Sequence, residues 1–408
     1  MLWILASAAI ALLCYEIPTL VTAVLWPLWN NPNALQTDFH YYYEAARRFS
    51  ADDTMLYLPT DDVIAGFAYP PPAIVPFMWL QQLPLGAALL LFTVASYAAL
   101  LVAIRMWLSY LEKHGVVADT STKIAVVLIA LACGPTYMNA IFGQVNAFVL
   151  ACSVAFVSFA PLLPLTAGVV LALGTLLKVY PIVLVAIGAW DRRTRRAVAW
   201  TIVAAAVIAV LTVPLIPPSA YRVFLFDVLP ARIDKTAIHI SNQSLVAFIE
   251  RFRYPSAQFL NWSGEQAVIV SGVVRVLNLG VAAAVILALV KRSGEGPRAQ
   301  ASSAATLIAL IAVIAPLGWG HTYVMVLPLV MLQLASLRDA RPIVAFTIVG
   351  CVAAMMIPAG RRLVILETAP DWLLNMMYSR YLLATLVLAA IPSTAIGRTT
   401  ESKTVTSA

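Results

Sequence analysis

Charged residues are scarce in this chain. Only 11% of its 408 residues are Asp, Glu, Lys or Arg, whereas a soluble domain carries about 25%. The same sequence is 62% hydrophobic and has a mean hydropathy of +0.89. Because so few charges cannot cover an aqueous surface, the composition excludes a soluble globular protein and predicts one embedded in a lipid bilayer.

Cysteine pairs, metal-ligand spacings and nucleotide loops are missing as well. The four cysteines fall inside apolar segments without a CxxC spacing, so they are expected to pack as small hydrophobic residues. No HExxH pattern and no paired His/Cys pattern occurs, and the phosphate-binding and dinucleotide motifs are absent. The sequence therefore predicts no metal site, no cofactor and no binding site for a nucleotide sugar or ATP.

What the sequence does contain is a series of apolar stretches separated by short charged runs. They are roughly 15 to 24 residues long, which suits helices that cross a hydrocarbon core of ~30 Å. Helices are expected because lipid offers the backbone no hydrogen-bond partners. The pattern predicts an all-α polytopic bundle of about twelve transmembrane helices, in a range of about 10 to 13. The expected spans are residues 6–28, 84–107, 122–140, 145–160, 164–178, 179–191, 197–217, 267–290, 301–318, 321–336, 342–358 and 379–396.

The net charge of +7 is explained by basic clusters in the connections between these spans. Under the positive-inside rule such clusters stay in the cytoplasm, so they indicate membrane anchors and not a nucleic-acid surface. An N-terminus on the inside places every cluster on the cytoplasmic side. The clusters lie in residues 105–123, 191–196, 291–298 and 338–341.

The opposite side of the membrane then receives the two long loops, residues 30–83 and 218–266. The connections on this side hold most of the acidic residues and histidines and many aromatic residues. A functional site is therefore expected on the outer face of one membrane domain, residues 1–398. The polar tail, residues 399–408, is expected to be disordered in the cytoplasm.

Two candidate sites lie in the first long loop. Asp38 begins an aromatic run just after the first span, where shielding from water suits a general base acting on a hydroxyl. The alternative is a helix cap, in which Thr37 or Asp38 accepts hydrogen bonds from backbone amides. Tyr69 precedes three prolines that are sufficient to start a helix. Its flat face and hydroxyl also suit a sugar site.

A tight turn and a lone lysine supply further candidates. Gln144 and Asn146 bring amides to the outer interface, where they either satisfy helix ends or bind sugar hydroxyls. Lys178 interrupts an apolar run of about 25 residues, and a lysine at membrane depth needs an anionic partner. A lipid phosphate is favoured over simple snorkelling to the interface.

The last candidates lie in the second long loop and at a later helix junction. Asn242 and Gln243 belong to a segment rich in hydrogen-bonding groups that directly precedes an apolar helix. His321 follows Trp319 and Gly320 at an outer junction. A lone histidine is usually structural, but between aromatic residues it is a candidate acid, base or phosphate-binding group.

Six short motifs, in this order, resemble those of glycosyltransferase family 87. They are Asp38-Phe39 with Tyr43, Tyr69-Pro70-Pro71, Gly143-Gln144-Val145-Asn146, Lys178-Val179-Tyr180-Pro181, Asn242-Gln243-Ser244-Leu245 and Trp319-Gly320-His321. The family consists of integral-membrane GT-C enzymes, among them polyprenyl-phosphate-mannose-dependent α-mannosyltransferases. The resemblance implies a GT-C-like fold and an inverting, metal-independent transfer of a hexose, with mannose the first candidate. The donor would be a polyprenyl-phosphate sugar and the acceptor a lipid or glycan.

The resemblance also implies a location and a set of roles. It suggests a bacterial inner-membrane protein that contacts membrane lipids and whose active site faces the periplasm. Asp38 matches a proposed base, and His321 is its rival for that role. Family members often carry a second histidine where this chain has Thr322, which leaves the division of roles open. The substrate-binding residues implied are Tyr43, Tyr69, Gln144, Asn146, Lys178, Tyr180, Asn242, Gln243 and Trp319.

The main alternative is a polytopic transporter or lipid flippase. Alternating access predicts polar groups near the membrane midplane that both sides can reach. Charges within the expected spans are few, mainly Glu16, Lys178 and Arg275, and the long loops are one-sided. Both features favour the enzyme. A non-catalytic scaffold would leave the polar motifs without an explanation.

Overall fold

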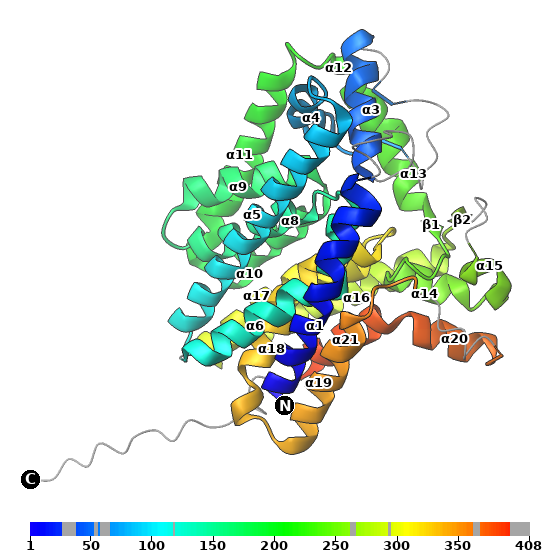
Figure 1. The fold of residues 1–408 in the computed structure, drawn as a ribbon. Helices are drawn as coiled ribbons and strands as arrows, with labels where there is room; N and C mark the ends of the chain where they lie inside the picture. Colours follow the sequence, from blue (N-terminus) through cyan, green and yellow to red (C-terminus); the bar gives the residue numbers. More distant parts are fainter. Residues whose placement is uncertain are drawn as a thin grey trace, which may run out of the picture.

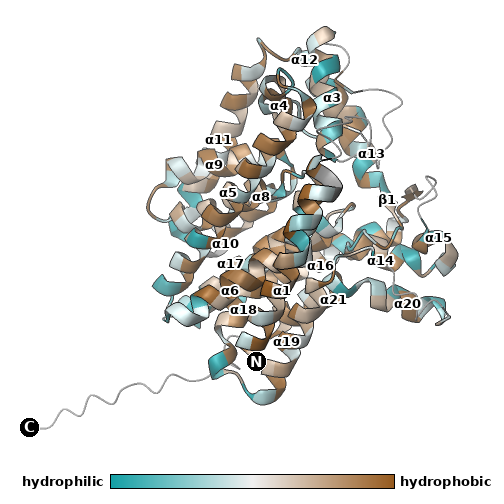
Figure 2. Cartoon of the chain, in the orientation of Figure 1, coloured by the Kyte–Doolittle hydropathy of each residue, from teal (hydrophilic) through white to brown (hydrophobic). Residues whose placement is uncertain are grey.

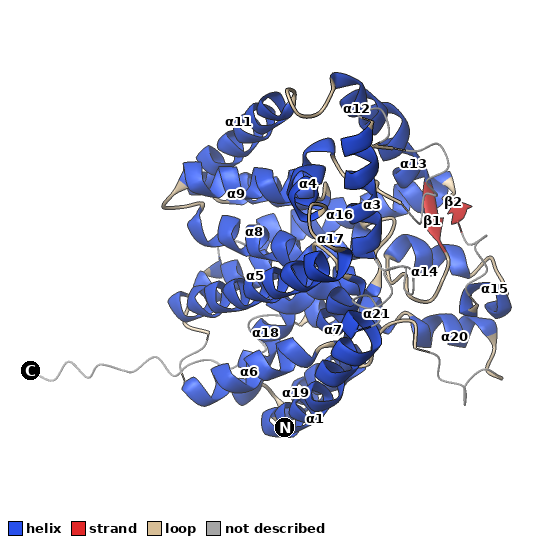
Figure 3. Cartoon of the chain, turned by 45° about the horizontal axis from the view of Figure 1, so that its top comes forward, coloured by secondary structure: helices blue, strands red, loops and turns tan. Residues whose placement is uncertain are grey.

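The computed structural model describes residues 1–26, 38–52, 56–57, 66–116, 119–261, 267–292, 295–361 and 368–391. These residues are predominantly helical (Figure 3). The one sheet found among them pairs two antiparallel strands of three residues each, β1 (Lys235–Ala237) and β2 (Ala267–Ile269). The predicted all-α membrane protein is confirmed at this level. The expected tail, residues 399–408, lies outside the described residues.

Five segments of the described chain are long and apolar enough to span a membrane. They are α1 (Leu2–Leu20), α5 (Leu85–Lys113), Arg192–Thr212 with α11 (Arg195–Thr212), α16 (Gly272–Arg292) and α17 (Pro297–Ile314). Two bent pairs raise the count to seven. They are α6 (Thr120–Ala132) with α7 (Gly134–Phe142), bent by 47°, and α20 (Asp371–Tyr378) with α21 (Arg380–Ala390), bent by 63°.

The predicted count of about twelve spans is thus not confirmed, because several apolar stretches form short helices. Both α8 (Asn146–Phe159) and α9 (Pro164–Leu177) have 14 residues, which is about 21 Å of helix against a hydrocarbon core of ~30 Å. The remaining short elements include η3 (Tyr180–Ala186), α10 (Ile187–Trp190), η4 (Arg192–Thr194), η7 (Gly320–Val326), α18 (Leu327–Ala335), η8 (Leu337–Asp339) and α19 (Pro342–Met356). The first span continues beyond α1 into η1 (Val21–Leu25).

The breaks between short helices occur where the local sequence interrupts the helical backbone. Cys133 is extended, with φ −62° and ψ 136°, and Pro135 sits in the first turn of α7. Proline fits the first turn of a helix but not its interior, so Pro135 favours the start of a new helix after Cys133. Lys178 is likewise extended, between α9 and η3. Such breaks bring polar side chains and helix ends into an apolar bundle.

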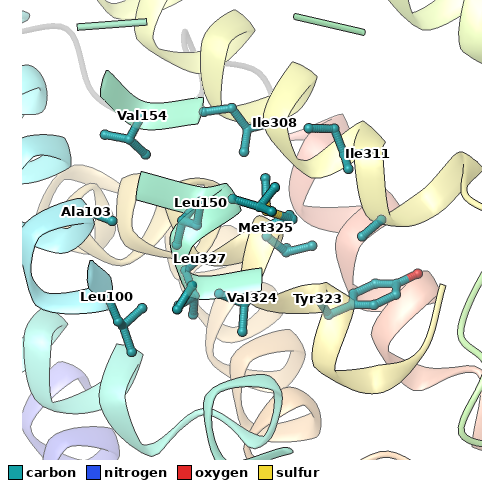
Figure 4. Close-up of a cluster of buried hydrophobic side chains, with 14 of the residues drawn as sticks. Leu100, Ala103, Leu150, Val154, Ile308, Ile311, Tyr323, Val324, Met325 and Leu327 are labelled. Carbon is teal, nitrogen blue, oxygen red and sulfur yellow. The ribbon is translucent and has the colours of Figure 1, made fainter. Parts of the chain in front are cut away.

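The core of the bundle is formed by α17 and by η7 with α18, which are buried along nearly their whole length. Helices α5, α8, α9 and α11 lie on one side of this core, and α1, α6 and α19 lie on the other (Figure 1). Figure 4 shows Leu150, Ile308 and Met325 meeting where α8, α17 and η7 pack together. The outer helices expose apolar side chains such as Ile4, Val210 and Leu279, as expected for a surface in contact with lipid. Much of the helical ribbon is hydrophobic in sequence (Figure 2).

The two predicted long loops are largely helical where they are described. The first contains α3 (Asp38–Ala51), η2 (Pro71–Ile74) and α4 (Val75–Leu80), and the second contains α12 (Pro218–Val223), η5 (Phe224–Val228), α13 (Leu229–Asp234), α14 (Leu245–Arg251) and α15 (Ser256–Leu260). Helices α3, α4, α12 and α13 gather at one end of the molecule, the top of Figure 1. These four helices therefore form a structured layer at that end of the bundle.

Candidate active site

Asp38 is the first residue of α3, and its carboxylate contacts the turn between α7 and α8. Gln144 Nε2 donates a hydrogen bond of 2.5 Å to Asp38 Oδ2. Gly143 makes this turn possible because it ends α7 in the left-handed region, at φ +61°. The hypothetical cap residue Thr37 lies outside the described residues. The described contact of the Asp38 carboxylate is with a distant part of the chain, 106 residues away.

Lys178 joins the same cluster from the break after α9. Its side chain is buried, and Nζ donates to Asn146 Oδ1 at 2.8 Å and to Gln144 Oε1 at 3.5 Å. Gln144 thus bridges the carboxylate of Asp38 and the ammonium of Lys178. Two amides give the ammonium neutral acceptors, and no carboxylate among the described residues lies within ion-pair distance of it. A buried cation in this state is suited to an anionic ligand.

Two tyrosine rings flank the ammonium of Lys178. Nζ lies 5.6 Å from the ring centre of Tyr69 and 5.8 Å from that of Tyr180. Both distances are within the reach of a cation–π attraction. The rings add an apolar wall to the cluster and hold the cation without neutralising its charge.

His321 approaches the cluster from the start of η7. Its Nδ1 lies 3.9 Å from Asp38 Oδ2, and Phe142 packs against the imidazole ring at 5.8 Å between ring centres. Asn146 Nδ2 donates to the backbone oxygen of His321 at 3.2 Å. The Nε2 atom is buried and has no hydrogen-bond partner in the described part of the chain. Because buried polar atoms are nearly always satisfied, Nε2 is a position where a ligand group would be stabilised.

Backbone hydrogen bonds from the Asn242 segment hold the residues around His321 in place. Asn242 and Trp319 form an isolated antiparallel bridge, and the amide of Gln243 donates to the oxygen of Gly318 at 2.8 Å. The side-chain amide of Asn242 donates to Ala237 O, and that of Gln243 donates to Tyr378 O. The side-chain amides of Asn242 and Gln243 are therefore hydrogen-bonded within the protein. Through their backbone contacts with Gly318 and Trp319, these residues stabilise the segment that carries His321.

The structure places Tyr42, not Tyr43, on the face of α3 that carries Asp38. The Tyr42 and Tyr69 hydroxyls are 2.8 Å apart, whereas Tyr43 donates to Leu83 O at 2.7 Å and ties α3 to the segment before α5. Residues four apart share a helix face, so the spacing of Asp38 and Tyr42 is the sequence signal that identifies Tyr42.

Arg232 on α13 is a second residue that the sequence did not identify. Its positive charge acts on Asp38, Tyr69 and Lys178, so the guanidinium lies close to the cluster. No motif surrounds Arg232, and the packing of α13 beside α3 brings it there (Figure 1). With Lys178 it gives the cluster two basic side chains beside the carboxylate of Asp38.

The electrostatic environment of Asp38 follows from this packing. About 30% of its side-chain surface remains exposed, but protein surrounds the carboxylate on most sides. This burial raises the pKa of Asp38 above its ordinary value of 3.8, while the hydrogen bond from Gln144 and the charges of Lys178 and Arg232 oppose the rise. The net direction is upward, which makes the carboxylate a stronger base than an exposed aspartate.

Comparison with known families decides the class of this protein. The model of glycosyltransferase family 87 matches residues 67–311, more than half of the chain. The chain belongs to glycosyltransferase family 87. No curated protein and no solved structure matches it.

Membership of glycosyltransferase family 87 makes the protein a transferase with a sugar donor and an acceptor. It supports this enzyme class over the transporter or flippase considered above. The matched range contains the cluster residues Tyr69, Gln144 and Lys178, whereas Asp38 and His321 lie outside it. Within the described residues, no group of three or more His, Cys, Asp and Glu side chains is placed to hold a metal ion.

Proposed function

We propose that this member of glycosyltransferase family 87 transfers a hexose, with mannose the first candidate, from a polyprenyl-phosphate sugar to a lipid or glycan hydroxyl. The observation that carries the proposal is the buried ammonium of Lys178, held by neutral amides and flanked by Tyr69 and Tyr180. A lipid phosphate is an anion that can reach a cation within the membrane. A protein that uses such a donor needs no nucleotide-binding domain.

The proposed reaction uses Asp38 as the base. The carboxylate takes the proton of the acceptor hydroxyl while the hydroxyl oxygen attacks the anomeric carbon of the sugar. The bond between that carbon and the phosphate oxygen breaks, and the electron pair leaves with the polyprenyl phosphate. A single displacement of this kind inverts the anomeric centre. The reaction as proposed needs no metal ion and no cofactor.

The cations of the cluster are proposed to stabilise the departing phosphate. Negative charge grows on this group as the glycosidic bond breaks, and preorganised positive charge acts most strongly at that moment. Lys178 and Arg232 supply it. The unpartnered Nε2 of His321 adds a hydrogen bond to the phosphate or to the sugar. His321 remains the alternative base, since its Nδ1 lies 3.9 Å from Asp38 Oδ2.

We further propose that the site faces the periplasm of a bacterial inner membrane. The cluster is built next to α3 and α13, which belong to the segments predicted to lie outside. The basic clusters that mark the cytoplasmic side lie in other connections, such as Arg192–Thr194. GT-C-like organisation follows from the same proposal, with the site at the outer ends of the membrane helices.

A donor panel tests the proposed function. The purified protein in lipid nanodiscs is incubated with a lipid extract of its host and with radiolabelled polyprenyl-phosphate mannose, glucose or arabinofuranose, and in parallel with the corresponding nucleotide sugars. We expect label in a lipid or glycan product from one polyprenyl-phosphate sugar and none from the nucleotide sugars. Transfer from a nucleotide sugar alone, or from no donor with folded protein, would contradict the proposal.

A further inference from the structure

A cavity of about 360 Å³ lies between the last turns of α5 and the end of α8, away from the Asp38 cluster. Its size falls within the range of small-molecule sites, about 300–1,000 Å³. Two basic side chains, Arg105 and Lys113, line it together with the hydroxyl-bearing Ser109, Tyr110 and Ser158. Residues of the candidate active site do not contribute to this lining.

The two basic side chains of the cavity form no ion pair with a described carboxylate, and the charge of Asp191 acts on Tyr110 in the same lining. Among the described residues, no carboxylate lies within ion-pair distance of Arg105 or Lys113. Glu112, the acidic residue next to Lys113, forms its ion pair with Lys123 instead. Both cations are exposed, so they are available to an anion that enters the cavity.

Ser158 gives a second and independent indication of a ligand. Its Oγ is buried and has no hydrogen-bond partner in the described part of the structure. Ser153 on the same helix donates to Val149 O at 2.8 Å, which is the usual solution for a serine in a helix. Ser158 is one of the residues that line the cavity, and a rotation of its side chain would bring this unpartnered hydroxyl to an anion there.

The cavity also opens toward the lipid. Val102 and Met106 form an apolar part of its wall, and Val102 is 52% exposed on the outer surface of α5. A ligand with a charged head and an apolar tail would therefore place its head between the cations and its tail along α5.

The position of the cavity along α5 corresponds to the membrane face opposite the Asp38 cluster. Phe39, which follows Asp38, packs on Phe92 of α5 at 5.0 Å between ring centres. Arg105 and Lys113 come 13 and 21 residues after Phe92 in this continuous helix, or about 20 and 32 Å along it. This separation approaches the ~30 Å of a hydrocarbon core.

We infer that this cavity binds the phosphate headgroup of an anionic phospholipid, on the membrane face opposite the Asp38 cluster. Basic pockets between transmembrane helices recognise such headgroups, with about 1 kcal/mol for each Lys or Arg near the surface. The inference concerns lipid binding and holds whether or not the sugar donor has been identified correctly.

Native mass spectrometry of the full-length protein tests it. The protein is titrated with phosphatidylglycerol or with phosphatidylcholine, and inorganic phosphate is added as a competitor. We expect preferential retention of phosphatidylglycerol. The double variant Arg105→Gln/Lys113→Gln should bind it about 30-fold more weakly, which corresponds to ~2 kcal/mol for two basic groups. Arg192→Gln/Arg193→Gln, with two basic residues outside the cavity lining, is the matched control and should bind as the wild type does.

A second variant separates the cavity from the charge. Ser158→Phe fills the cavity while both cations remain, and it should also weaken phosphatidylglycerol binding if it elutes as a monodisperse protein. Equal retention of the two lipids, or unchanged affinity in both variants, would overturn the inference. Displacement of the lipid by millimolar inorganic phosphate would show a site for free phosphate and would likewise overturn it.

Discussion

The ammonium of Lys178 is the group whose removal has the most direct consequence for the proposed chemistry. Lys178→Met keeps the length and much of the volume of the side chain and removes its charge. One positive charge about 4 Å from a phosphate is attracted to it by about 4 kcal/mol at an effective dielectric constant of ~20. A charge-assisted hydrogen bond contributes about 1.5–3 kcal/mol net. We take ~2–4 kcal/mol as the loss of transition-state stabilisation, which is about 30- to 1000-fold in kcat/KM.

The assay is transfer of radiolabelled sugar from the donor that the panel identifies, with kcat/KM and thermal unfolding measured on the same preparation. Removing a buried cation that has only neutral partners relieves its desolvation cost, so Tm should change little. Lys178→Arg should retain part of the activity because it keeps the charge. Lys291→Met, at the end of α16, is the control for loss of one positive charge. Wild-type kcat/KM in Lys178→Met, or a loss that only parallels unfolding, would refute the assignment.

Three further predictions concern Asp38, Gln144 and Asn242. First, because Asp38 must be ionised to act as a base and burial raises its pKa above 3.8, kcat/KM should fall as the pH decreases through an inflection above that value. An inflection at or below 3.8 in the pH–rate profile would contradict this. Second, Gln144→Leu removes a hydrogen bond that lowers the pKa of Asp38. The inflection should therefore move to higher pH, and an unchanged or lower inflection would count against the contact. Third, Asn242→Ala leaves buried partners unsatisfied and should cost about 1–3 kcal/mol of stability. Thermal unfolding checks it, and an unchanged Tm would be inconsistent with the supporting role of Asn242.

Part of this site could be predicted because polarity in an apolar sequence is itself informative. Lys178, Gln144 and Asn146 stand out in stretches that are otherwise apolar, and a buried polar group needs a partner. The structure shows that Lys178 contacts both Gln144 and Asn146 and that Gln144 reaches Asp38. Which of them would meet could not be deduced from spacing, since the contacts join residues 32 to 106 positions apart.

Other features depend on three-dimensional packing or on backbone conformation. Arg232 belongs to the cluster only because α13 packs at the same end of the molecule as α3 (Figure 1). The predicted number of spans is not confirmed, because hydropathy does not show where a helix breaks, as it does at Cys133 and Lys178. Asn242 and Gln243 have the composition of a binding segment, and their amides are bonded to backbone oxygens of the protein.

The central claim is that the cluster around Asp38 is where the sugar is transferred. Its most direct test is kcat/KM of purified, monodisperse Asp38→Asn and His321→Gln compared with the wild type, using the donor found in the panel. Asparagine preserves the shape of the side chain and its place beside Gln144, but it cannot take a proton at neutral pH. Loss of a catalytic base costs about 10²–10⁴ in rate, so we predict a fall of that size for Asp38→Asn and a smaller one for His321→Gln. Near-normal transfer by folded Asp38→Asn would contradict the account.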